Sequence, residues 1–111
     1  MVTQAGLRSS DERDVFKAIA DPTRRALLDQ LRSGPRSVTA LASSFPHSRP
    51  AISKHLKVLS TAGLLTERMV GREHIFELHP TALREVDGWL DQYRVFWGAS
   101  LSNLKRHLEK K

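Results

Sequence analysis

The sequence predicts a mainly helical α+β fold in which a single small β-hairpin is set among the helices. Over most of the chain apolar residues recur every three or four positions, which is the spacing of buried helix faces. Two short runs, 64–70 and 73–78, instead alternate in character around a glycine, and that pattern is typical of a hairpin. The final stretch, 80–108, is amphipathic along its length. The expected order is therefore four helices, the hairpin and one long helix.

Length and composition limit the number of domains and the kinds of site. With 111 residues the chain has the size of one domain, and we expect a flexible arm over 1–10 and a single domain over 11–111. A core of this size is modest, so burial at a subunit interface is a natural supplement. The sequence contains no cysteine, which excludes disulfides and thiolate metal sites. We predict no cofactor.

The charge of the chain indicates the kind of partner. Its formal net charge is +6 and its isoelectric point is about 10.3, which favours a polyanion, with nucleic acid first and an acidic membrane surface second. No apolar run is long enough to span a bilayer, and the first residues lack the pattern of a secretory signal. We therefore expect a cytoplasmic protein.

The first two helices follow from their caps and breaks. The first is expected to begin near Asp11 and to place apolar residues of 15–20 on its buried side. The pair Asp21–Pro22 predicts a stop and a restart, because Asp is a good N-cap and Pro suits the first helical position. The second helix is expected to end around 33–35, where Gly precedes Pro.

A helix-turn-helix unit is predicted next. Ser37 can cap a short third helix whose apolar side holds Val38 and Leu41. Residues 45–47 form the turn into a fourth helix that begins at Ser48 and reaches residue 59. The spacing is compact enough for two helices joined by a tight turn.

The fourth helix has one apolar and one polar side. Ser48 can act as its N-cap, and Pro50 fits its first turn. The apolar side holds Ile52, Leu56 and Leu59. The opposite side holds Arg49, Ser53, Lys54 and Lys57. Such a surface suits a DNA major groove, which needs cations for phosphates and polar groups for base edges. Taken alone, the pattern fits an amphipathic surface helix with solvated lysines equally well.

The segment after this helix favours the DNA-reading interpretation. Gly63 is placed to end the helix, and the hairpin follows with Arg68 and Arg72 expected at its tip. A basic helix followed by a hairpin with a basic tip is the arrangement of a winged helix-turn-helix. The helix is expected to enter the major groove and the wing to touch a neighbouring minor groove or phosphates.

The last helix carries an apolar stripe too long for a small domain to cover. We predict that it pairs with the same helix of a second chain, assisted by the first helix, because aromatic residues gathered on one face are typical of interface cores. The alternative is that it folds back over its own domain. The expected interface residues are Val15, Phe16, Ile19, Val86, Trp89, Leu90, Tyr93, Phe96, Trp97, Leu101 and Leu104.

Several side chains are candidates for contact with DNA. Arg49 can pair with guanine, Lys54 with guanine or phosphate, and Lys57 with phosphate. Ser37 and Thr39, near the start of the third helix, can meet a phosphate or serve only as caps. The imidazole at position 55 more often packs or forms a hydrogen bond than reads a base. The full set is Ser37, Thr39, Ser48, Arg49, Pro50, Ser53, Lys54, His55, Lys57, Arg68 and Arg72.

Other charged residues receive simpler interpretations. Arg24 and Arg25 are expected to be solvated or paired with Asp21 or Asp29. The remaining histidines have no ligand spacing, so we predict no metal site. We find no catalytic triad, phosphate-binding glycine loop or metal-activated water site, so the chain is not expected to be an enzyme.

Three motifs together resemble the ArsR/SmtB family of bacterial winged-helix repressors. They are residues 18–31, residues 48–59 and residues 62–65, and the resemblance runs from about Val15 to Leu108. It implies a homodimer in which the first and last helices pair and two recognition helices read a palindromic operator. It also implies repression that an inducer relieves, so a small-molecule inducer is possible.

The chain departs from the metal-sensing members of that family. Ser37 and Thr39 occupy the positions where such members commonly carry cysteines, and neither is a soft-metal ligand. A second family site uses Asp and His at the start of the last helix with His and Glu later in it. Here Asp87 and Asp91 share a face, but the later histidine, His107, is badly spaced for that pattern. Neither metal site carries over.

One alternative function stays open on the sequence. The winged helix could be a protein–protein interaction module in which the last helix docks a different protein and DNA binding is incidental. A heteromeric partner that requires Trp89, Tyr93 or Trp97, together with no preferred DNA, would distinguish this reading.

Overall fold

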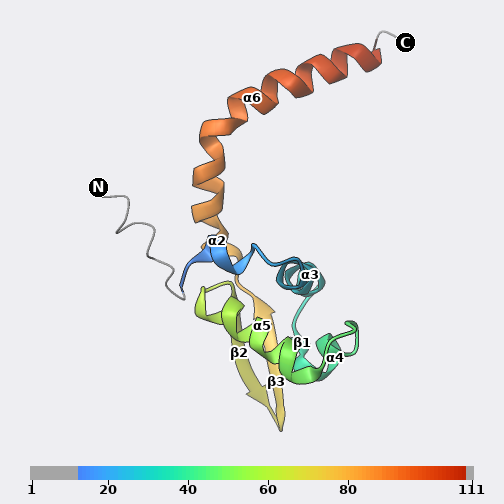
Figure 1. Cartoon of the computed structure of the whole chain (residues 1–111), viewed down its shortest axis with the longest axis vertical. Coiled ribbons are helices and arrows are strands. Elements are labelled where there is room, and N and C mark those ends of the chain that lie inside the picture. The colour runs from blue at the N-terminus through green and yellow to red at the C-terminus, as the bar shows by residue number, and fades with distance from the viewer. Residues whose placement is uncertain (1–12, 110–111) are drawn as a thin grey trace.

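The computed structural model describes residues 13–109, apart from the side chains of 99–103. Figure 1 shows a helical domain that carries a small sheet and a long terminal helix. The elements in order are α2 (Val15–Ala18), α3 (Pro22–Leu31), β1 (Arg36–Ser37), α4 (Val38–Ala42), α5 (Arg49–Thr61), β2 (Leu65–Val70), β3 (Glu73–Leu78), the 3-10 helix η1 (Pro80–Leu83) and α6 (Arg84–Glu109).

Side-chain caps fix where the helices begin. The Asp21 carboxylate accepts hydrogen bonds from the backbone of α3, Ser37 caps α4 and Ser48 caps α5, so these three predictions are confirmed. The prediction for the first helix was wrong in its extent. The helix α2 has only four residues. It begins after Asp14, because the Asp14 carboxylate accepts hydrogen bonds from the Phe16 and Lys17 N–H groups and so acts as its N-cap. Asp11 lies outside the described residues.

The hairpin is confirmed, and a third strand is added to it. β2 and β3 pair antiparallel from Leu65–Leu78 to Val70–Glu73. Gly71 turns the chain between them with a φ of +64°, a conformation that favours glycine. The two-residue strand β1 pairs antiparallel with the other edge of β3, giving the order β1-β3-β2. A two-residue strand is too short to show an alternating pattern, so it was not predicted.

The core lies between the helices and one face of this sheet. Its α5 members Ile52, Leu56 and Leu59 are fully buried, which confirms the predicted apolar side of that helix. Among residues 13–98 and 104–109 no polar or charged residue is buried. The buried set is Val15, Ala18, Leu27, Leu31, Val38, Leu41, Ile52, Leu56, Leu59, Ala62, Leu64, Leu65 and Phe76.

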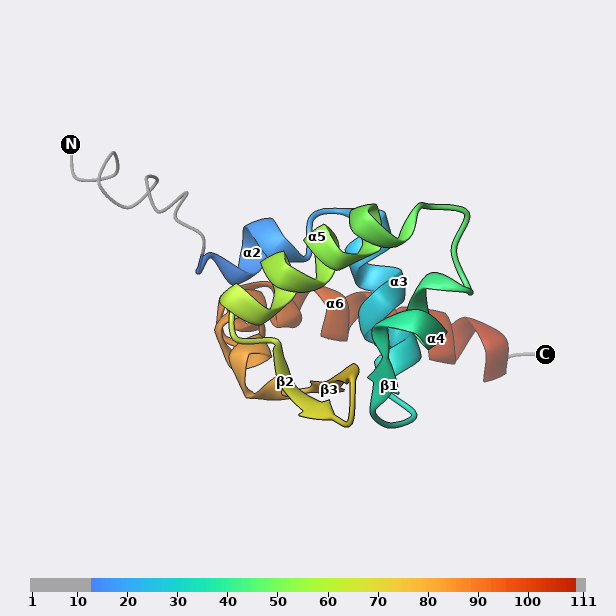
Figure 2. The same ribbon diagram turned by 90° about the horizontal axis from the view of Figure 1, so that it is seen from below.

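The terminal helix leaves the domain instead of folding back over it. η1 precedes α6, and Leu83 and Val86 still pack against the core. Beyond them α6 runs outward and bends (Figure 1), and Figure 2 shows the same helix from below. Most of its large apolar side chains remain about half exposed, from Tyr93 at 40% to Val95 at 71%. No helix within residues 13–109 is long and apolar enough to cross a membrane.

Candidate nucleic-acid interface

The outer side of α5 presents the polar residues that the sequence predicted. Arg49, Ser53, Lys54 and Lys57 are exposed, whereas the opposite side of the helix is in the core. The helix is held by contacts with α2, α3, α4 and β2. None of the three cations forms an ion pair or side-chain hydrogen bond in the described part of the chain, so their charges are available to a partner.

Two N-caps set the start of the helix-turn-helix unit. The Ser48 hydroxyl accepts from the Ala51 N–H at 3.2 Å, with exposed Pro50 in the first turn, so Arg49 projects from the beginning of α5. The Ser37 hydroxyl accepts from the Ala40 N–H at 3.0 Å. Ser37 is half-buried and Thr39 is exposed at the start of α4.

The wing differs from its predicted form in the position of one arginine. Arg72 lies in the turn between β2 and β3, as expected. Arg68 lies within β2 opposite Ile75, not at the tip, and its guanidinium forms an ion pair with Glu77 at 3.1 Å. Strand β2 continues its pairing with β3 for two residues beyond Arg68, so the turn begins only after Val70.

Carboxylates accompany the cations of the wing. Between residues 65 and 78 there are two arginines, at 68 and 72, and three glutamates, at 67, 73 and 77. Glu67 lies 2.9 Å from the Nδ1 of His74. With histidine counted as neutral, the hairpin therefore has a formal charge of −1. The wing is not a basic surface, and only its tip offers an arginine without an ion-pair partner among the described residues.

Arg24 has a structural role that the sequence analysis missed. Its Nε donates to the Ala18 carbonyl at 2.6 Å and its Nη2 to the Lys17 carbonyl at 3.2 Å. Its Nη1 lies 3.2 Å from the Nδ1 of His55 on α5. The expectation that Arg24 is solvated or ion-paired was wrong, because the last carbonyls of short α2 lack intrahelical donors. One guanidinium thus joins α2 to α5.

Arg25 serves the same segment. Its Nη1 donates to the carbonyls of Ile19 and Ala20 at 2.9 and 3.0 Å. The signal in the sequence was a helix that ends shortly before the break at Asp21–Pro22, followed by two arginines within reach of the free carbonyls.

His55 is partly buried at the edge of the polar side of α5. It forms a hydrogen bond, as expected for this imidazole from the sequence. Because arginine has donors only, the His55 Nδ1 accepts from Arg24 and the Nε2 carries the proton. Asp21 lies 4.0 Å away. Slight burial raises the pKa of Asp21, but hydrogen bonds from the Arg24 and Thr23 N–H groups and the charge of Arg24 lower it below its usual value.

The predicted interface residues fall into two groups. Phe16 packs edge-on against Trp89 with ring centroids 5.8 Å apart, and Trp89 lies 5.3 Å from Tyr93. Val15 is only 3% exposed within its own chain, so it has little surface left for a partner. Partly buried members are Ile19, Val86 and Leu90. Strongly exposed members are Trp89, Tyr93, Phe96, Trp97 and Leu104. The side chain of Leu101 lies outside the described residues.

Acidic residues of α6 are paired with an arginine. Arg94 bonds to Asp91 at 2.6 Å and also to Asp87, so the shared face predicted for the two aspartates is confirmed. Within residues 13–109 no group of three or more histidine or carboxylate side chains is arranged to hold a metal ion.

The comparisons with known proteins agree with this geometry. Residues 19–68 match a helix-turn-helix domain family. The chain is 43% identical to the HTH-type transcriptional regulator Rv2034 of Mycobacterium tuberculosis, over 86% of this chain and 84% of that one. It is 38% identical to the transcriptional repressor SdpR of Bacillus subtilis, over 69% of this chain and 86% of that one.

A solved structure resembles the whole fold. It is the homodimeric winged helix-turn-helix DNA-binding domain of a possible ArsR-family transcriptional regulator from Mycobacterium bovis. The TM-score is 0.58 at 25% identity, and the match covers 91% of this chain and 89% of that one.

Proposed function

Because this chain belongs to the ArsR/SmtB family of winged helix-turn-helix transcriptional regulators, we propose that it is a repressor that binds a palindromic operator as a homodimer. The family consists of DNA-binding regulators and not of enzymes, so its activity is recognition. We place this activity in the cytoplasm, where the DNA of a bacterial regulator is found.

The two-sided burial of α5 is the observation that carries the proposal. Ile52, Leu56 and Leu59 fix the helix to the core, and exposed cations stand on its outer side. A recognition helix reads bases mainly with its N-terminal residues. Arg49, in the first turn, is therefore assigned to a guanine edge and Ser53, one turn later, to close approach. Lys54 is assigned to guanine or phosphate and Lys57 to phosphate.

The flanking elements are assigned to the DNA backbone. Ser37 and Thr39 at the start of α4 are placed near a phosphate, and Arg72 at the wing tip near the minor groove or phosphates. Arg68 has to leave Glu77 to reach a phosphate. Both partners are about half exposed, so this exchange costs little, about 1 kcal/mol or less. His55 and Pro50 border the reading side and take a supporting part.

The dimer is assigned to α6 and α2. The exposed aromatic side chains of α6, with Phe16 beside Trp89, form a surface that a second copy can cover. Two-fold pairing would present two α5 helices to successive major-groove segments, about 34 Å apart. Repression follows from the similarity to SdpR, which is named a repressor.

Selection from a random duplex library at near-physiological salt tests this function. We expect an enriched inverted repeat whose half-sites lie about one helical turn apart. Binding that is sensitive to salt but indifferent to sequence would contradict the proposal. It would favour the interaction-module alternative, and partners of α6 would then be sought.

A further inference from the structure

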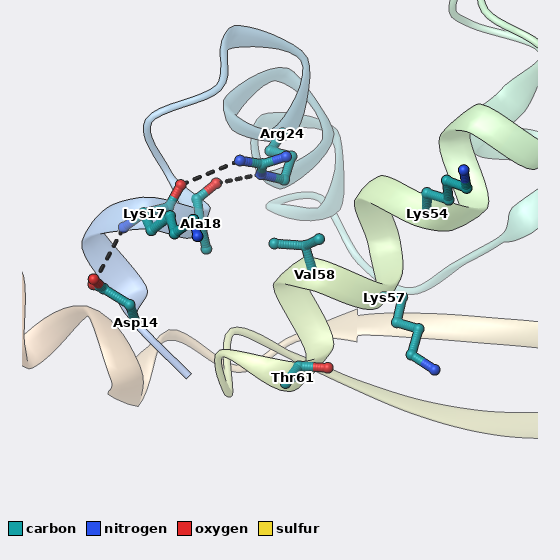
Figure 3. Close-up of a pocket in the computed structure, with 8 residues that line it drawn as sticks. All are labelled: Asp14, Lys17, Ala18, Arg24, Lys54, Lys57, Val58 and Thr61. Carbon is teal, nitrogen blue, oxygen red and sulfur yellow. Dashed lines mark hydrogen bonds between the residues drawn. The ribbon is translucent and has the colours of Figure 1, made fainter. Parts of the chain in front are cut away.

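A cavity of about 430 Å³ lies between α2 and α5, beside the proposed reading side (Figure 3). We name it the α2–α5 cavity; Ala18, Val58, Lys17, Lys54 and Lys57 are among its lining residues. Its volume falls within the range of about 300–1,000 Å³ that is typical of small-molecule sites. The assigned DNA contacts do not use its interior.

The centre of the cavity is apolar. Val58 projects from α5 toward α2 (Figure 3) and is 36% exposed, although the same side of α5 is otherwise polar. Ala18 faces it from α2 and is fully buried within the chain. An apolar body placed here would cover surface that the chain itself leaves open to water.

The rim of the cavity is positively charged. Lys17, Lys54 and Lys57 are exposed, and their ammonium groups have no ion-pair partner among the described residues. The single lining carboxylate, Asp14, is engaged as the N-cap of α2 and turns toward the Lys17 backbone (Figure 3). The Arg24 guanidinium is engaged by backbone carbonyls and His55. The charge left to a ligand is thus cationic.

We propose that the α2–α5 cavity binds a small carboxylate with an apolar body, and that this ligand lowers the affinity for DNA; the second part rests on the proposed function. Lys54 and Lys57 point outward from α5, away from Val58 (Figure 3). Their flexible stems allow each ammonium to turn either to a phosphate or to the rim of the cavity. Ligand and DNA therefore compete for the same two charges.

The position of α2 adds a second route for this effect. Arg24 ties the end of α2 to α5, and Phe16 of α2 packs against Trp89 of α6. A ligand between α2 and α5 therefore contacts the reading helix and also the helix that joins it to the proposed dimer surface. Because coupling between two sites is reciprocal, DNA should weaken ligand binding by the same factor.

The probe for this site is 1-naphthoate, an aromatic carboxylate of suitable size. Neutral 1-naphthamide, which has the same shape, is the matched control. Binding to the whole chain is measured by NMR, with transfer of magnetisation between the probe and the Val58 methyl groups as the test of location. Operator binding is then measured with and without saturating naphthoate. We expect naphthoate to bind more tightly than naphthamide and to raise the operator Kd about fivefold or more.

Two variants test the assignment without touching the proposed DNA contacts. Lys17→Gln removes a rim charge and should weaken naphthoate binding roughly two- to fivefold. Val58→Thr keeps the shape but places a hydroxyl in the apolar centre, and should weaken it about threefold. Lys105→Gln removes the same charge from exposed α6 and should change nothing. All three should leave the operator Kd in the absence of probe within about twofold.

Several results would overturn the inference. These are equal binding of naphthamide, loss of binding in Lys105→Gln to the same extent as in Lys17→Gln, or contacts of the probe with another part of the protein and none with Val58. Naphthoate that binds without changing the operator Kd would remove the regulatory part. Failure to select any operator would instead count against the proposed function, since binding of the probe is measured without DNA.

Discussion

The reading helix α5 and the wing formed by β2 and β3 are both assigned to contact with DNA, but their charges are arranged differently. The cations of α5 have no ion-pair partners among the described residues, and its inner side is anchored by three fully buried side chains. In the wing Arg68 is paired with Glu77 and Glu67 with His74. Only Leu65 and Phe76 of the wing are buried. From this difference we expect α5 to supply sequence preference and most of the binding, and the wing to add a small contact at its tip.

The largest expected effect tests the anchoring of the two regions. Leu56→Ala should lower the free energy of unfolding by about 2–5 kcal/mol, because it leaves a cavity under α5. Val70→Ala in the wing truncates a side chain that is 54% exposed. It should change the free energy of unfolding by about 0.5 kcal/mol or less. Urea unfolding at a fixed protein concentration measures both. Similar losses in the two variants would show that the wing is anchored as firmly as α5.

Arg49→Ala tests the reading assignment itself. It should cost about 1–3 kcal/mol at the selected operator, because a bidentate contact with guanine is lost. Binding to random DNA should fall much less. Fluorescence anisotropy with both duplexes at one salt concentration gives the comparison. If specific and random DNA lose the same affinity, Arg49 contacts only the backbone.

Arg24→Ala tests the hydrogen bonds by which one guanidinium joins α2 to α5. The wing has no such link to a neighbouring helix among the described residues. The substitution leaves the Ala18 carbonyl without a donor, whereas the Lys17 carbonyl still accepts from the Ala20 N–H, and it should lower the free energy of unfolding by about 1–2 kcal/mol. Arg24→Lys should recover only part of this, since lysine cannot span two carbonyls and His55. Arg32→Ala, at an exposed position on the C-terminal side of α3, is the control in the same urea titration. A loss in Arg32→Ala as large as in Arg24→Ala would argue against the link.

A smaller effect is expected from the charges of the wing. Lys57→Ala on α5 should reduce the slope of log K against log salt by about 0.9, the contribution of one phosphate contact. Arg68→Ala should reduce it less, because Glu77 competes for the guanidinium. Glu77→Gln should raise the operator affinity about twofold by releasing Arg68. Glu85→Gln, an exposed carboxylate at the start of α6, is the control. Equal slopes for Lys57→Ala and Arg68→Ala would remove the distinction between helix and wing.

The smallest effect concerns pH. The pKa of Asp21 is lower in the folded chain than its usual value of 3.8. A carboxyl with a depressed pKa stabilises the folded state above its unfolded pKa, and this contribution is lost as the pH falls through the folded value. Asp21→Asn keeps a capping oxygen but does not titrate, so its unfolding free energy should fall less steeply on acidification below about pH 4. If Asp21→Asn and the natural chain lose unfolding free energy equally on acidification, Asp21 is not the source of the acid dependence.

The parts of the molecule that the sequence predicted are those with strong local signals. Asp21, Ser37 and Ser48 cap helices as expected, and Gly71 turns the hairpin in the expected place. Burial of Ile52, Leu56 and Leu59 on one side of α5 follows from their spacing alone. These features depend on neighbours within a few positions along the chain.

The features that were missed depend on contacts between distant segments. β1 exists because two residues of the chain pass beside β3. Arg24 finds its acceptors in α2 and α5, which adjoin it only in the folded chain. Arg68 was expected at the tip, but its ion pair with Glu77 depends on the register of the hairpin. The roles of the candidate DNA contacts stay predictions until a complex is measured.

The most direct test of the central claim is to repeat the selection of duplexes with Arg49→Ala and Arg72→Ala beside the natural chain. If α5 reads the sequence, Arg49→Ala should lose preference at one position in each half-site. Arg72→Ala should then enrich the same repeat as the natural chain, with lower affinity only. An unchanged repeat for Arg49→Ala together with an altered one for Arg72→Ala would assign the reading to the wing and contradict the account.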